Sequence, residues 1–309
     1  MRATFVKTLV EIAERDERVI LLTGDLGFMV VEPFADRFPD RFVNVGVAEQ
    51  NMVGVATGLA EAGFIPFVYS IVTFSTLRPY EFIRNGPVLQ RLPVRIVGVG
   101  GGFGYGPAGP THHGLEDVGV LRIQPGLTVL TPADARQAAT ALHATYDLPG
   151  PVYYRLGKSD RDELHGLDGR FALGRAHLTR TGRDVLLVAM GSIALDVDTA
   201  VVALQKQGID CGLLVVSSVS PPPADDLAEA LAGYSLAVAV EAHYTVGGLG
   251  SLVSEVIAER GLACRLIRRG AREASTGRSG SEQYFHQLHG LDTDGLVATV
   301  TGALELAPR

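Results

Sequence analysis

Short apolar runs alternate with longer amphipathic stretches along the whole chain. The apolar runs, rich in Val, Ile and Leu, predict strands at residues 19–23, 42–46, 66–69, 94–99, 127–130 and 152–156, and a second set at 185–190, 212–217, 236–241 and 264–267. Apolar residues at helical spacing fill most of the intervals between these runs. Such alternation predicts parallel sheets covered by helices on both faces.

The two sets of strands predict two domains. A charged segment with little long-range apolar periodicity, residues 157–183, separates them. We therefore expect a first doubly wound α/β domain at 1–158, a linker at 159–179 and a second α/β domain at 180–309. A chain of 309 residues is long enough for two domains that each have a core.

Composition and charge narrow the class of protein. With 47% hydrophobic and 20% charged residues and 37 glycines, the chain is globular and rich in tight turns. A net charge of −7 argues against nucleic acid as a partner. The two cysteines, Cys211 and Cys264, lie in apolar runs and are expected to be buried thiols. Acidic residues interrupt the apolar positions near the N-terminus, and no apolar run approaches the ~20 residues of a membrane span. We expect a cytoplasmic protein without membrane contact.

One acidic residue stands where the pattern changes from strand to helix. Residues 41–47 alternate as a short strand does, Glu49 follows, and residues 52–62 favour a helix. An acid at such a junction either points into a cleft or complements the positive end of the helix. The residues alone leave both readings open.

The helix expected after Glu49 has a smooth face. Gly54, Gly58 and Ala62 are four residues apart and share that face. Each glycine costs roughly 1 kcal/mol of helix propensity relative to alanine, so a close approach by another backbone should offset this cost. Packing on the domain's own sheet and packing at a subunit interface are both consistent with the pattern.

Several motifs occur in one order along the chain. They are Glu49, residues 63–68, Phe74 with Arg78 and residues 84–85, the glycine-rich loop 100–106, the block 109–114, residues 131–134, and residues 241–251. This order resembles the transketolase family, whose members use thiamine diphosphate. The first half is similar to the pyrimidine-binding domain of that family and the second half to its C-terminal domain.

The resemblance implies roles for particular residues. Glu49 matches the glutamate that activates the cofactor's aminopyrimidine, and Phe74 matches the ring that stacks on it. Ile71 and Leu77 lie at the spacing where relatives often have aromatics, although residues 71, 74 and 77 also fit a core-facing helical stripe. Asp25 matches an acid near the cofactor, with a turn aspartate as the alternative.

The histidines add one further candidate. His112, which follows the turn-forming residues 109–111, matches the histidine that hydrogen-bonds the substrate or an intermediate. The roles of His113 and His243 stay open. The loop 247–251 is typical of a helix start, where an anion could bind, but tight packing of a turn explains its glycines equally well.

A second glycine motif is a weak match. Residues 104–109 fit the spacing G-x-G-x-x-G of dinucleotide-binding folds. Pro107 and Pro110 fall where the required turn and helix would form, which argues against nicotinamide binding.

One family motif is missing. Relatives hold the diphosphate and its metal with Gly-Asp-Gly followed at a distance by Asn, and no Gly-Asp-Gly occurs here. The resemblance therefore implies a split enzyme in which an N-terminal transketolase subunit carries that motif and holds Mg²⁺ or Ca²⁺. We assign no metal ligand to this chain and expect an α2β2 assembly that acts on a small-molecule substrate.

The expected reaction is transfer of a two-carbon ketol unit from a ketose-like donor to an aldehyde acceptor. Pro107 and Ala108 replace acidic residues of sugar-phosphate transketolases, and Gly100 replaces a phosphate-binding histidine, which puts phosphorylated substrates in doubt. The alternatives are the β subunit of a 2-oxo-acid dehydrogenase, a deoxyxylulose-type synthase and a non-catalytic scaffold.

Overall fold

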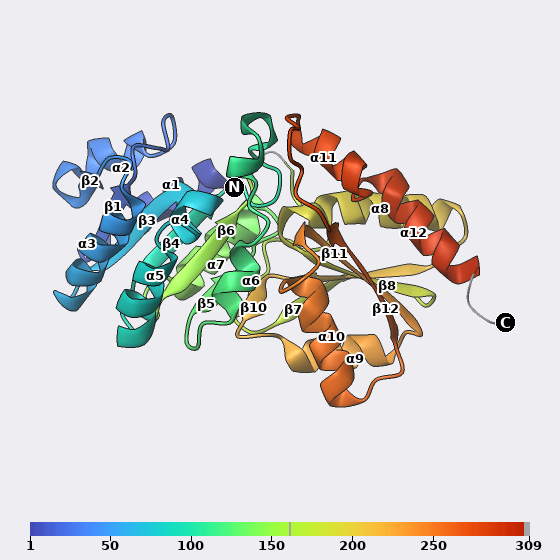
Figure 1. The fold of residues 1–309 in the computed structure, drawn as a ribbon. Coiled ribbons are helices and arrows are strands. Elements are labelled where there is room, and N and C mark those ends of the chain that lie inside the picture. Colours follow the sequence, from blue (N-terminus) through green and yellow to red (C-terminus); the bar gives the residue numbers. More distant parts are fainter. Residues whose placement is uncertain (161, 306–309) are drawn as a thin grey trace.

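The computed structural model describes residues 1–160 and 162–305 and contains two sheets side by side, each covered by helices (Figure 1). The first sheet has the strand order β10-β5-β6-β4-β3-β1-β2. Its strands are β1 Val19–Thr23, β2 Phe42–Asn44, β3 Ile65–Ile71, β4 Arg95–Val99, β5 Thr128–Leu130, β6 Val152–Leu156 and β10 Ser218–Ser220. All of them are parallel except β10, which pairs antiparallel with β5.

The second sheet has the order β12-β11-β8-β9-β7. Its strands are β7 Ala176–Arg180, β8 Val185–Met190, β9 Cys211–Val216, β11 Leu236–Tyr244 and β12 Arg265–Ala271. Only the edge strand β7 is antiparallel to its neighbour. The predicted fold class, two doubly wound α/β domains, is confirmed.

Helices fill the intervals between strands. The α-helices are α1 Arg2–Ala13, α2 Glu32–Arg37, α3 Glu49–Glu61, α4 Val72–Thr76, α5 Tyr80–Ile83, α6 Asp117–Arg122, α7 Ala135–Thr145, α8 Ala194–Lys206, α9 Ala224–Ala232, α10 Leu249–Arg260, α11 Glu282–His289 and α12 Thr293–Glu305. Short turns of other helical types occur at η1 Pro39–Arg41, η2 Arg84–Val88, η3 Gly106–Ala108, η4 Pro110–His112 and η5 Gly191–Ile193.

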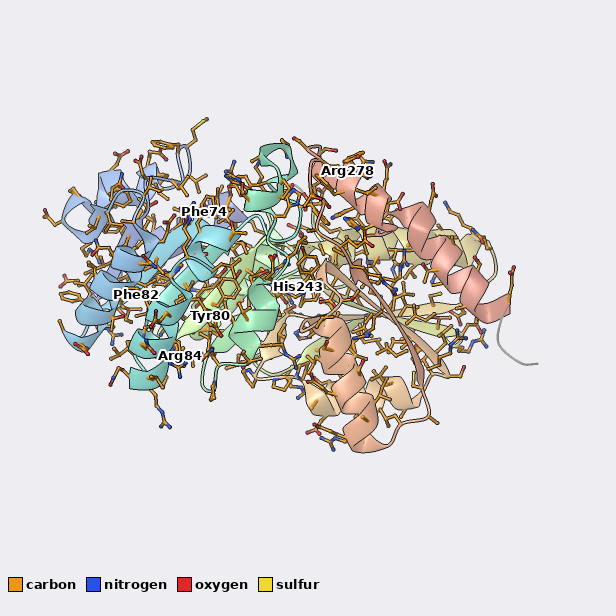
Figure 2. All side chains as sticks on the ribbon, viewed as in Figure 1. Phe74, Tyr80, Phe82, Arg84, His243 and Arg278 are labelled. Carbon is orange, nitrogen blue, oxygen red and sulfur yellow. The ribbon has the colours of Figure 1, made fainter. Side chains whose placement is uncertain are left out.

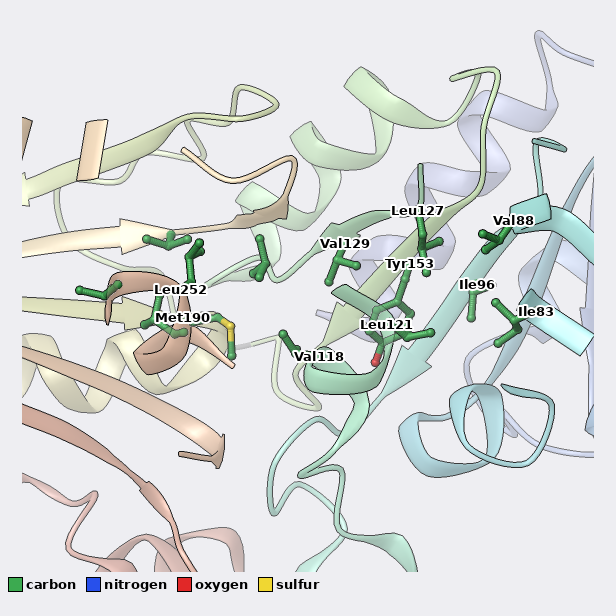
Figure 3. Close-up of a cluster of buried hydrophobic side chains, with 14 of the residues drawn as sticks. Ile83, Val88, Ile96, Val118, Leu121, Leu127, Val129, Tyr153, Met190 and Leu252 are labelled. Carbon is green, nitrogen blue, oxygen red and sulfur yellow. The ribbon is translucent and has the colours of Figure 1, made fainter. Parts of the chain in front are cut away.

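The buried side chains form three clusters. One lies between the first sheet and α1, α2 and α7, and another between the second sheet and α8, α11 and α12. The third runs without interruption through both domains, from Met52 and Val118 to Met190 and Leu252 (Figure 3). Each sheet therefore has a buried cluster of its own, and the third cluster is shared by the two domains.

Two short strands lie outside the predicted set. β7 begins inside the segment expected to be a linker, and β10 follows β9 after a single residue. β10 belongs by sequence to the second half but extends the first sheet, where Ser218 pairs with Leu130. This strand and the shared core hold the two domains together.

The first sheet reverses its winding beside β1. The chain passes from β1 outward to β2 and then returns across β1 to β3. At such a switch point the loops after neighbouring parallel strands separate and leave a crevice at their carboxyl ends. Asp25 follows β1, Glu49 begins the helix after β2, and Phe74 lies in the helix after β3, which places three of the predicted site residues at this edge of the sheet.

Candidate functional site

Glu49 is the first residue of α3 and is buried, with 3% of its surface exposed. The turn before it depends on Gly46, whose φ of +72° lies in the left-handed region that glycine adopts without strain. The loop after β1 packs against the side chain of Glu49. A Cβ atom added at Gly24 in that loop would lie 3.7 Å from Glu49 Cγ. Glu49 therefore points inward at the switch point and is not a solvent-exposed helix-start acid.

Arg78 is the partner of that carboxylate. Its Nη1 donates to Oε1 and Oε2 of Glu49 at 2.9 and 3.0 Å. Its guanidinium carbon also lies 3.7 Å from the centroid of the Phe74 ring. One planar cation is thus stacked on Phe74 and hydrogen-bonded to Glu49. This ion pair was not predicted from the sequence.

His112 is a second neighbour of Phe74. The two rings meet edge to face with their centroids 4.9 Å apart, and Thr111 Oγ1 is 3.0 Å from His112 Nδ1. Gly109, with φ of +84°, and Pro110 form the turn that presents the imidazole. Burial, followed by the nearby positive charge of Arg78, lowers the pKa of His112, so its imidazole is neutral at neutral pH.

The remaining predicted cofactor contacts are less closely grouped. Ile71 is the buried last residue of β3, Phe74 lies in α4, and Leu77 is exposed beyond the end of that helix. The trio is therefore not a core-facing helical stripe. Asp25 is exposed, has φ of +58°, and accepts a hydrogen bond of 3.0 Å from Asn44 Nδ2. A turn role explains Asp25 in this state of the protein.

A buried polar network, which the sequence did not reveal, fixes the loop after His112. Arg155 Nε donates to Asp117 Oδ2 at 2.8 Å, and Tyr153 donates to the same oxygen at 2.7 Å. Arg155 Nη2 also donates to the carbonyls of Gly114 and Ala242, at 2.8 and 2.9 Å. Gly114 follows the histidine pair and Ala242 belongs to β11, so this guanidinium joins the site loop to the second domain.

His113 turns away from its neighbour into an aromatic environment. Its ring meets Phe103 and Phe285 edge to face, with centroids 5.2 and 4.7 Å apart. Burial lowers its pKa, and its Nε2 is buried without a hydrogen-bond partner. His113 therefore contacts a ring from each domain and contributes to the packing between them. It is not part of the cluster formed by Glu49, Phe74 and His112.

The start of α10 is already occupied by a side chain of the protein. Backbone N–H groups of Leu249 and Gly250 donate to the carboxylate of Glu241 at 2.7 and 2.9 Å. A side chain at Gly248 would collide with that carboxylate, so tight packing explains this glycine. Burial raises the pKa of Glu241 to about 7. The suggested anion site at residues 247–251 is therefore filled from within the chain.

His243 lies beside Glu241 at the boundary of the two domains (Figure 2). Its Nε2 accepts a hydrogen bond of 3.2 Å from the N–H of Gly119, and its Nδ1 is 2.7 Å from the carbonyl oxygen of Tyr244. The ring thus carries its proton on Nδ1 and is neutral, in keeping with the lowering of its pKa by burial. These contacts give His243 a structural role between α6 and β11.

Three other expectations concern ligands, thiols and membranes. The glycine motif at 104–109 forms the short turn η3, and α6 does not begin until Asp117, which fits the argument against a dinucleotide site.

Cys211 and Cys264 are free and buried, as predicted. Among the residues that the structure describes, no group of His, Cys, Asp or Glu could hold a metal ion, and no helix is long and apolar enough to cross a membrane.

Comparison with known proteins agrees with the fold. Residues 1–162 match the family described as transketolase, pyrimidine binding domain, and residues 174–296 match transketolase, C-terminal domain. The chain is 33% identical to one subunit of the apulose-4-phosphate transketolase of Phocaeicola vulgatus, over 100% of this chain and 97% of that protein. It is 34% identical to the 6-deoxy-6-sulfo-D-fructose transketolase subunit SqwH of Clostridium sp., over 96% and 92%.

A solved structure is similar over the full length. It is described as a split gene transketolase, inactive beta4 tetramer, and superposes with a TM-score of 0.90 at 33% identity, covering 99% of each chain. Each of these matches extends over nearly all of this chain and therefore over both of its domains. The chain belongs to the transketolase family and corresponds to the subunit of a split transketolase that carries the pyrimidine-binding and C-terminal domains.

Proposed function

We propose that this chain supplies the pyrimidine side of a thiamine diphosphate site and acts as a transketolase-type transferase together with a second subunit. One observation carries the proposal. The planar guanidinium of Arg78 stacks on Phe74 and hydrogen-bonds to the buried Glu49. A pyrimidine ring bound in this place needs the same two contacts, so the residues fit the cofactor once Arg78 moves away. Arg78 is 43% exposed, which leaves its side chain room to move.

Each residue then has a defined task. The bound cofactor supplies a carbanion-like nucleophile at C2 of its thiazolium ring. Glu49 shares a proton with the pyrimidine nitrogen that lies opposite the amino group in the ring, and Phe74 holds the pyrimidine plane. His112, neutral and next to Phe74, is placed to hydrogen-bond an oxygen of the substrate. Ile71, Leu77 and Asp25 are proposed as outer contacts of the same pocket.

The proposal requires a partner. We infer that an N-terminal transketolase subunit with the Gly-Asp-Gly and Asn motif holds the diphosphate and Mg²⁺ or Ca²⁺, in an α2β2 assembly. Support comes from the absence of that motif in this sequence and from relatives that are themselves described as subunits.

The smooth face of α3 is our candidate for subunit contact. Gly54, Gly58 and Ala62 are exposed, and a Cβ atom added at Gly58 would meet no atom within 4 Å. This face therefore does not pack on the domain's own sheet. The exposed side chains of Val55 and Phe82 lie on α3 and on the neighbouring α5. An exposed apolar surface of this kind marks an interaction site.

The proposed reaction is transfer of a two-carbon ketol unit between a ketose-like donor and an aldehyde acceptor. Relatives of nearly full length are described as transketolase subunits, which favours this reaction over that of a 2-oxo-acid dehydrogenase. The retention of Glu49, Phe74 and His112 in one cluster speaks against a non-catalytic scaffold.

The test uses the complex that this chain forms with its native partner. Ketol transfer is measured over a panel of ketose donors and aldehyde acceptors that includes xylulose 5-phosphate and ribose 5-phosphate. Glu49→Ala should lower turnover by at least about a hundredfold, the scale of general acid–base catalysis. Glu11→Ala, an exposed change on α1, is the control and should leave turnover unaltered. Near-normal turnover in Glu49→Ala would refute the assignment.

A further inference from the structure

A basic cavity lies in the second domain of this acidic protein. It has a volume of about 460 Å³ and is formed by the end of β12, the segment after it, and the end of α11. Arg269, Arg272 and Arg278 contribute three positive charges to its lining, and Glu273 contributes one negative charge. The chain as a whole carries a net charge of −7, so the lining of this cavity has the opposite sign of charge to the protein.

The three guanidinium groups are not neutralised by carboxylates. Arg269 Nη2 donates to the carbonyls of His289 and Gly290 at 3.2 and 3.1 Å, and its Nε is buried without a partner. Arg272 and Arg278 are exposed, and within the described ranges neither forms an ion pair. Burial, followed by the like charge of Arg272, lowers the pKa of Arg269. An anion between these groups would relieve that repulsion.

The cavity also holds fixed neutral polar groups. Ser275 Oγ and His289 Nε2 are 3.1 Å apart on its wall, and Thr276 adds a second hydroxyl. The loop that carries Arg278 is fastened to the first domain, because Ser279 Oγ donates to the carbonyl of Pro107 at 2.7 Å. Guanidinium groups pair with phosphate through two parallel hydrogen bonds, and hydroxyls complete such sites.

A wall of buried rings separates this cavity from the Glu49 site. Phe103 is fully buried and stacks on His289 and on Phe285, with centroids 5.1 and 4.9 Å apart, while His113 meets it edge-on. Figure 2 shows Arg278 beside α11 and Phe74 on the first domain, well apart. A ligand in the cavity therefore does not reach the Phe74 ring.

An apolar cavity adjoins the basic one. It has a volume of about 470 Å³, shares Arg272 and Ala274 with the basic cavity, and is lined by Val120, Tyr244 and Val246 among others. A molecule with an anionic end and an apolar body could thus occupy both, with Arg272 between the two parts.

We propose that this pair of cavities is a second ligand site, which binds a small phosphomonoester by its phosphoryl group at Arg269, Arg272 and Arg278 and by its apolar body along Val120 and Tyr244. Three guanidinium groups match a dianion better than a carboxylate with its single charge. The site is distinct from the proposed thiamine diphosphate site and needs no residue of it.

The experiment is calorimetric titration of the full chain at constant ionic strength. The probes are inorganic phosphate, phenyl phosphate and acetate. Phenyl phosphate should bind more tightly than phosphate, and acetate more weakly than both. Arg272→Gln and Arg278→Gln should each weaken phenyl phosphate binding by about tenfold or more, the effect of losing one charge-assisted hydrogen bond. Arg15→Gln removes an exposed arginine of the first domain, and Glu49→Gln alters the other site; both should bind as the wild type does.

Several results would overturn the proposal. Unchanged affinity in Arg272→Gln and Arg278→Gln would place the anion elsewhere, and an equal loss in Arg15→Gln would show unspecific charge attraction. Loss of binding in Glu49→Gln would move the ligand to the thiamine diphosphate site. Acetate binding as tight as phosphate would reject the phosphoryl group, and equal affinities for phosphate and phenyl phosphate would reject the apolar part.

Discussion

The substitution Asp117→Ala should strongly destabilise the folded chain. Asp117 is 1% exposed and accepts hydrogen bonds from Arg155 Nε at 2.8 Å and from the hydroxyl of Tyr153 at 2.7 Å. Arg155 is also buried, and its other hydrogen bonds go to the uncharged carbonyls of Gly114 and Ala242. Removing Asp117 therefore leaves a buried guanidinium without its ion-pair partner.

The expected loss follows from these contacts. Breaking one side of a buried ion pair costs about 3–5 kcal/mol. The orphaned hydroxyl of Tyr153 adds about 1–3 kcal/mol if no other acceptor replaces Asp117. Because both donors share one oxygen, the two costs overlap, and we expect a total of about 4 kcal/mol. That is a large fraction of the roughly 5–15 kcal/mol that stabilises a typical domain.

Urea unfolding followed by circular dichroism measures this loss. The control is Glu163→Ala, because Glu163 pairs with Arg136 at 3.1 Å and both side chains are more than half exposed. Such a surface pair contributes about 0–1 kcal/mol. Asp117→Asn, which keeps an acceptor oxygen without the charge, should fall between the two. If Asp117→Ala were no more destabilising than Glu163→Ala, the network would not join the domains as we describe.

The remaining predictions concern the site, the start of α10 and assembly. His112→Ala should lower turnover of the complex by about a hundredfold or more while the unfolding midpoint changes little, because the ring is only partly buried; a matching loss of stability would contradict this. The pKa of Glu241 is raised from 4.5 to about 7, so between pH 4.5 and 7 the folded state binds the proton of this carboxyl more tightly than the unfolded state does. The stability that protonated Glu241 contributes is therefore lost as pH rises through about 7. The stability of the wild type relative to Glu241→Gln should therefore decline from pH 4.5 to about 7, and a flat difference would refute the shift. Gly58→Leu should weaken assembly in sedimentation with little effect on folding, since its side chain has free space in the single chain, and unchanged assembly would remove the interface proposal.

The strand pattern was predicted well wherever a strand is buried on both faces. Residues 185–190 form β8 with the predicted bounds, because a continuous apolar run between turn signals is a strong local signal. β10 was missed because its three residues include two serines, and its pairing with Leu130 is decided by a contact between domains. A sequence pattern of period two or 3.6 contains no information about such a contact.

In the candidate site too, local features were predictable from the sequence and contacts between distant residues were not. The position of Glu49 at a strand-to-helix junction was readable, because the change of period and the first-turn acid are local features. Its pairing with Arg78 was not, since the two residues are 29 positions apart in the sequence. Glu241 is a second case: its carboxylate folds back onto the N–H groups of residues 249 and 250, and only the structure shows that this helix start is filled.

The most direct test of the account is the rate at which the C2 proton of thiamine diphosphate exchanges for deuterium in the complex, because this step needs no knowledge of the substrate. We predict fast exchange when this chain, its partner and Mg²⁺ are all present, and slow exchange, close to that of the free cofactor, in Glu49→Gln. Glu11→Gln, an exposed change on α1, should exchange like the wild type. Equally fast exchange in the wild type and in Glu49→Gln would contradict the central claim that this buried carboxylate activates the cofactor.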